Sequence, residues 1–85
     1  MNYVISVFSS RSETLSFANF LRRQGIACGV VQTPKEAGRT CGLSVKFRYE
    51  DFAMVKGLFG GLRFMSFQGF FLEQNSGGFP TIRRV

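Results

Sequence analysis

The sequence contains no histidine, and this absence removes several classes of enzyme. Without an imidazole, neither a Ser-His nor a Cys-His nucleophile pair can form, and no side chain offers a base near neutral pH. Two cysteines without histidine also cannot complete a tetrahedral zinc site within one chain. We therefore expect no metal site.

Acidic residues are scarce, with five Asp and Glu against eleven Lys and Arg. Only Glu50 and Asp51 are adjacent, and a helix start explains them, so paired-carboxylate chemistry is not expected. The glycine pairs lack the spacing and the lysine of nucleotide-binding loops. We expect no bound cofactor and no enzyme acting alone. The net charge of +6 suits an anionic partner, although the basic residues form no long block.

A long apolar run is also missing. The first ten residues, MNYVISVFSS, have no basic leader and no cleavage site of small residues. We expect neither a signal peptide nor a transmembrane helix, and hence no membrane partner. A cytoplasmic location, in which both cysteines stay reduced, is the default expectation.

What the sequence does contain is enough apolar material for a packed core. The hydrophobic fraction is 45%, with eleven phenylalanines in 85 residues. A domain of this size buries only about 60 to 65% of the surface of its unfolded chain. Association with a second copy would add stability, so we expect a homo-oligomer.

Apolar periodicity predicts the order β-α-β-β-α-β. Strands are expected over residues 2–8, 27–32, 42–48 and 63–72, the first of them central because both its faces are apolar. Ser10 and Glu13 have the spacing of a capping box before the first helix, and Gly25 fits its end. Gly60-Gly61 ends the second helix, and Gly69 indicates a bulge or a close approach.

This order predicts an α+β fold, a ferredoxin-like βαββαβ sandwich with a four-stranded antiparallel sheet and two helices on one face. Residues 1–74 would form this single domain. Residues 75–85 open with a linker composition, and we expect them to form a flexible C-terminal tail.

The candidate site is the segment TPKEAGRTCG, residues 33–42, which leads into the third strand. Pro34 favours an extended-to-turn conformation, and Gly42 leaves the backbone beside Cys41 uncovered. Lys35 and Arg39 would lower the pKa of the Cys41 thiol, because nearby cations stabilise the thiolate. The same residue types also fit a structural reading, in which Cys41 is a small residue at a strand end.

Cys28 lies inside the apolar run 26–31, and we expect it in the core. The predicted hairpin would place Cys28 and Cys41 about 16 Å apart along the strands, so a disulfide between them is not expected.

A second candidate is the sheet face away from the helices, with Ser44, Lys46 and Arg48. Three phenylalanines, Phe8, Phe64 and Phe70, could join them on this face. Aromatic rings beside cations could stack bases and hold phosphates. However, the strand GLSVKFRY does not match the pattern of RNA-recognition strands. We favour burial of this face against a second copy over nucleic-acid binding.

The run Thr33-Pro34-Lys35 followed by Cys41-Gly42-Leu43 resembles the small bacterial domains of the selenium/sulfur carrier-like family. Lys35 stands where that family often has arginine. The resemblance implies that Cys41 accepts sulfur or selenium from a donor protein and passes it to an acceptor protein. The alternative, from another class, is a non-catalytic binding or oligomerisation module that uses the open sheet face and the basic charge.

Overall fold

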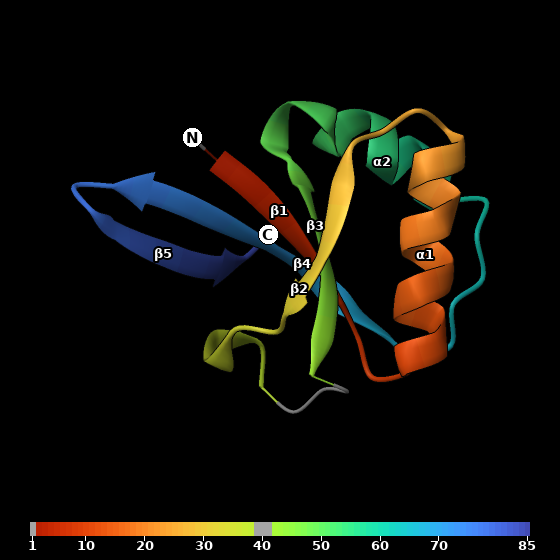
Figure 1. Cartoon of the computed structure of the whole chain (residues 1–85), viewed down its shortest axis with the longest axis horizontal. Helices are drawn as coiled ribbons and strands as arrows, with labels where there is room; N and C mark the ends of the chain where they lie inside the picture. Colours follow the sequence, from red (N-terminus) through yellow and green to blue (C-terminus); the bar gives the residue numbers. More distant parts are fainter. Residues whose placement is uncertain (1, 39–41) are drawn as a thin grey trace.

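The computed structural model describes residues 2–38 and 42–85 of the chain. These residues form a single sheet, two α-helices and two short 3-10 helices (Figure 1). In chain order, the elements are β1 (Asn2–Phe8), α1 (Arg11–Arg23), β2 (Cys28–Gln32), η1 (Lys35–Ala37), β3 (Leu43–Arg48), η2 (Tyr49–Asp51), α2 (Phe52–Phe59), β4 (Phe67–Ser76) and β5 (Phe79–Arg84).

The first strand, β1, lies in the middle of the sheet, as its two apolar faces predicted. The strand order is β2-β3-β1-β4-β5, and every neighbouring pair is antiparallel. The predicted α+β class, with two helices and an antiparallel sheet, is confirmed. The predicted count of four strands is wrong. Residues 79–84, expected in a flexible tail, pair with β4 as a fifth strand.

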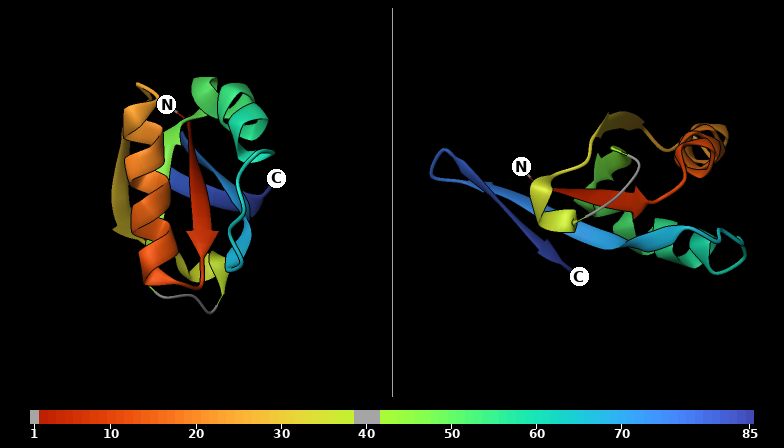
Figure 2. Two further views of the ribbon diagram at one scale, coloured as in Figure 1. Left: turned by 90° about the vertical axis from the view of Figure 1, so that its right-hand side faces the viewer. Right: turned by 90° about the horizontal axis from the view of Figure 1, so that it is seen from below.

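Both helices pack on one face of the sheet (Figure 2). Val4 and Phe8 of β1 point to this face, because side chains alternate along a strand, and both are fully buried. The helices contribute Phe17 and Leu21 from α1 and Val55 from α2 to the same core. Several phenylalanine rings meet edge to face there, the arrangement that their quadrupoles favour.

The other face of β1 is also covered. Ile5 and Val7 are buried together with Phe71 of β4, and Ala37 and Ile82 pack against these three side chains. We call Ile5, Val7 and Phe71 the second cluster. Its covering residues come from η1 and β5, which lie on the side of the sheet away from α1 (Figures 1 and 2).

The start of α1 confirms one half of the predicted capping box. The Glu13 N–H donates to Ser10 Oγ at 3.3 Å. The other half is wrong, because the Glu13 carboxylate accepts hydrogen bonds from the backbone N–H groups of Met65 and Ser66 and from the Ser66 hydroxyl. The Ser10 N–H donates to Ser66 Oγ instead, at 3.1 Å. The first turn of α1 is thus joined to the loop that precedes β4.

The strand β4 begins later than the sequence predicted, at Phe67 instead of Arg63. Met65, in the loop before it, is 95% exposed. Both predictions for Gly69, a bulge and a close approach, are confirmed. The β1–β4 register shifts opposite this residue, and a side chain on Gly69 would collide with the guanidinium of Arg84. Arg84 donates from Nη1 to the Gln68 carbonyl at 2.7 Å, which ties the end of β5 to the bulge.

The Glu13 contacts predict a pH dependence of stability. Hydrogen bonds from Ser66 lower the pKa of the Glu13 carboxyl. The bond from the Ser66 hydroxyl has the larger effect, and the bond from the Ser66 backbone N–H has the next largest. A carboxyl whose pKa is lower in the folded state stabilises the fold above its unfolded pKa, about 4.3, and loses this effect as the pH falls through the folded pKa. Glu13→Gln should therefore lower the urea midpoint at pH 7 and change it less in acid. Equal pH slopes for the two proteins would contradict this.

Candidate functional site

The segment between β2 and β3 holds the predicted site residues. Arg39 and Cys41 lie outside the described residues, whereas Pro34, Lys35 and Gly42 lie within them. Pro34 is extended, with φ −64° and ψ 151°, and η1 begins directly after it with Lys35. The Ala37 N–H donates to the Pro34 carbonyl at 3.1 Å, which closes this turn. The predicted proline turn is therefore present, and the Lys35 side chain is exposed on it.

The short helix η1 is fixed to the sheet through Ala37. This residue packs against the second cluster, beside Ile82 of β5. Because apolar contact with the sheet removes part of the Ala37 side chain from water, it stabilises the turn. Sequence reasoning missed Ala37, since a single alanine between charged and glycine residues gives no signal of burial.

Polar contacts fix the beginning of β3. The Thr33 N–H donates to the Gly42 carbonyl at 3.0 Å, and the hydroxyls of Thr33 and Ser44 lie 2.6 Å apart. The Thr14 hydroxyl, from α1, lies 3.4 Å from the Leu43 carbonyl. Ser44 and Thr14 are both fully buried. These contacts hold the residues on either side of the candidate segment in one geometry.

Gly42 has a backbone requirement of its own. Its φ is 91°, a conformation that residues with a Cβ rarely adopt. The glycine after Cys41 is therefore needed for the shape of the chain, whatever the thiol does. Among the described residues, and leaving out its chain neighbours, no atom lies within 4 Å of a Cβ built on Gly42, and the residue itself is exposed.

Cys28 packs at the edge of the main core, in agreement with the expectation from its apolar run. Its Sγ donates to the Ala18 carbonyl of α1 at 3.5 Å. Burial raises the pKa of the Cys28 thiol, and the nearby charge of Arg22 only partly opposes this effect. A thiol of this kind carries little thiolate near neutral pH and is a poor nucleophile.

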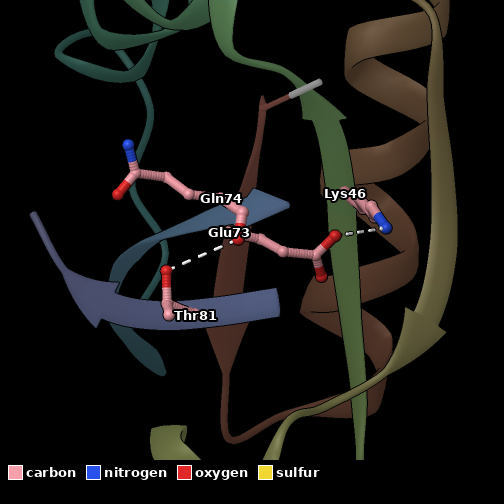
Figure 3. A network of polar contacts seen from close by, with 4 residues as sticks. All are labelled: Lys46, Glu73, Gln74 and Thr81. Atoms are coloured by element: carbon pink, nitrogen blue, oxygen red, sulfur yellow. Dashed lines mark hydrogen bonds and ion pairs between the residues drawn. The ribbon is translucent and has the colours of Figure 1, made fainter. Parts of the chain in front are cut away.

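The open face does not form the expected aromatic platform. Phe8, Phe64 and Phe70 all belong to the helix side of the sheet, so their predicted place on the open face is wrong. Lys46 pairs with Glu73 at 2.9 Å (Figure 3). Its Nζ also lies over the Tyr3 ring, 4.4 Å from the ring centroid. Arg48 pairs with Asp51 at 3.2 Å. The face therefore offers paired cations and few rings, which does not favour base stacking.

A hollow of about 320 Å³ lies at the edge of this face, beside β2. Its walls include Tyr3, Val31, Lys46 and Arg48, and Gly29 contributes no side chain to it. The hollow lies beside the β2 strand and does not include Pro34, Lys35 or Gly42.

Within residues 2–38 and 42–85, no three Cys, Asp or Glu residues come close enough to hold a metal ion. Among the described residues, no helix combines the length and the apolar character needed to cross a membrane.

Comparison with known proteins assigns most of the chain to a family. A family described as "Putative Se/S carrier protein-like" matches residues 2–61, from β1 to the end of α2 and including the whole segment 33–42. Among curated proteins and solved structures, nothing matches the chain.

The environment of Cys28 predicts slow chemistry. In a Cys41→Ser variant, which leaves Cys28 as the remaining thiol, alkylation by iodoacetamide should be about tenfold slower at pH 7.5 than after unfolding in urea, because its pKa is raised and its sulfur is half-buried. Intact mass against time gives the rate. An alkylation midpoint below about 8.5, the value for a free thiol, would contradict this.

Proposed function

The chain belongs to the Se/S carrier protein-like family, and from this membership we propose that it carries sulfur or selenium as an adduct on Cys41. The observation that carries the proposal is the family match, which covers the Pro-Lys turn and the Cys-Gly pair together. The exposure of Gly42, the residue after Cys41, supports it, because a carrier atom must be reached by two different partners.

The proposed step needs a thiolate and a donor persulfide, and no histidine base. The Cys41 thiolate attacks the outer sulfur of the donor persulfide, forming a new S–S bond while the S–S bond within the donor breaks. The donor cysteine leaves as a thiolate, and the proton stays on the transferred sulfur at low pH or passes to water. In the transfer to the acceptor, a thiolate of the acceptor attacks the outer sulfur carried by Cys41, and the Cys41 thiolate leaves. No external oxidant or reductant is consumed, and selenium follows the same balance.

The segment around Cys41 would supply position and charge. Pro34 and Gly42 set the chain direction on either side of it, and the part-buried Thr33–Ser44 contact keeps the two ends together. Lys35 and Arg39 would stabilise the thiolate and attract acidic partners. The protein would then be a carrier and not an enzyme, since the chemistry of extraction belongs to the donor. A reducing cytoplasm suits a thiol that must stay free.

We also infer that the first four strands and the two helices keep the predicted ferredoxin-like arrangement. The order β2-β3-β1-β4, with α1 after β1 and α2 after β3, supports this reading. The strand β5 would then be an addition at the β4 edge.

Replacement of the thiol tests the carrier role. Wild-type protein treated with glutathione persulfide should gain the mass of one sulfur atom, and Cys41→Ser should not, because serine cannot form the S–S bond. Cys28→Ser is the matched control and should load like wild type, since Cys28 is half-buried with a raised pKa. Intact mass before and after reduction gives the result. An adduct that persists in Cys41→Ser and disappears in Cys28→Ser would end the proposal.

A further inference from the structure

The outer edge of β2 presents free backbone groups in a regular pattern. This strand ends the sheet, and its described partner is β3. Because the Thr33 N–H points to Gly42 of the β3 side, the alternation of an antiparallel pair directs the N–H and C=O groups of Gly29 and Val31 towards β3 as well. The groups of Cys28, Val30 and Gln32 therefore point outward, where a further strand could bind them.

This edge lacks the features that normally prevent strand addition. Its sequence, CGVVQ, has no charge and no proline, and its pairing with β3 continues without a bulge. The opposite edge differs. There β5 contains Pro80 and two arginines, Arg83 and Arg84, residue types that hinder the pairing of a further strand with an edge strand. Of the two edge strands, β2 is the one without such residues.

Positive charge stands at both ends of β2. Arg22 and Arg23 lie in the last turn of α1, just before β2, and Arg22 is close enough to act on the Cys28 thiol. Lys35 follows the other end of the strand. Within the described part of the chain, none of these three cations forms an ion pair, in contrast to Lys46 and Arg48. An extended segment with acidic residues at both ends would match this arrangement.

The hollow beside β2 adds a place for one side chain. Gly29 has open space where a Cβ would stand, and it faces the same side of the sheet as its partner Lys46. In an added antiparallel strand, the residue opposite Gly29 would form a non-hydrogen-bonded pair, whose side chains lie closest. A large side chain at that position would enter the hollow against Tyr3 and Val31.

We propose that the β2 edge binds an extended acidic segment of a partner protein, which adds to the sheet as a further strand and places a large side chain over Gly29. The identification of that partner as the sulfur or selenium donor or acceptor rests on the proposed function. A second copy of this chain fits less well, because each copy carries a net charge of +6 and the same cations beside the edge. The strand leads directly into the segment 33–42, so a partner bound here lies next to the candidate thiol segment.

Amide hydrogen exchange, followed by NMR on the full chain, tests the proposal. The probe is a peptide of sequence Glu-Glu-Val-Tyr-Val-Glu-Glu, and its counterpart with lysine in place of glutamate is the control. The acidic peptide should slow the exchange of the Cys28, Val30 and Gln32 amides and leave those of Gly29 and Val31 almost unchanged. Absence of this alternation at millimolar peptide would overturn the proposal. Slowing that depends on protein concentration without peptide would assign the edge to a second copy and also overturn it.

Two variants separate the backbone and charge contributions. Val30→Pro removes an outward N–H and should weaken binding about tenfold, the effect of a lost hydrogen bond and a misplaced ring. Arg22→Gln should weaken binding about two- to fivefold at low salt and less at high salt. Arg63→Gln removes the same charge from the loop before β4 and should leave binding unchanged. Equal losses from the two arginine variants would overturn the proposed position of the acidic residues.

The Cys41→Ser variant distinguishes this proposal from the carrier proposal. It should bind the acidic peptide like wild type, because the β2 edge does not need the thiol. Normal peptide binding by a wild-type protein that fails to load sulfur would end the carrier role and keep the edge site. Normal sulfur loading without amide protection would end the edge site and keep the carrier role.

Discussion

The burial of β1 on both faces is the constraint on which the rest of the structure depends. Val4 and Phe8 on one face and Ile5 and Val7 on the other are all removed from water. Two helices can cover one face of a sheet this small, and something else must cover the second. Here η1 and β5 do so, through Ala37 and Ile82. A segment that would otherwise be a loop is thus part of the core.

This constraint connects stability with the proposed function. Ala37 lies in the same short segment as Lys35, directly after the proline turn, so the packing that covers the second cluster also fixes η1. The part-buried Thr33–Ser44 contact joins the residues at the start of the segment to β3. If the protein acts as the proposed carrier, fixed residues before and after the thiol segment would keep the geometry of approach similar for donor and acceptor.

The cations on the sheet face and those beside the β2 edge differ in whether they form ion pairs. Lys46 and Arg48 are used within the fold, in pairs with Glu73 and Asp51. The cations around β2 are not paired within the described residues, and they account for part of the excess of +6. Because unpaired surface charge acts over about 8 to 10 Å at ordinary salt, the proposed acidic partner would be attracted to the β2 edge more strongly than to the face with the paired cations.

The sequence by itself determined what depends on neighbours along the chain: the helix with Ser10 before it and Gly25 after it, the alternation in β1 and β3, the proline turn, and the irregularity at Gly69. Only the tertiary structure decided which distant groups meet. Glu13 resembled half of a capping box and instead binds Ser66, Phe8 and Phe70 belong to the helix side, and a tail of linker composition is a strand. The physical reason is that local periodicity fixes the direction of a side chain relative to its own strand, whereas the register between strands fixes what lies opposite it.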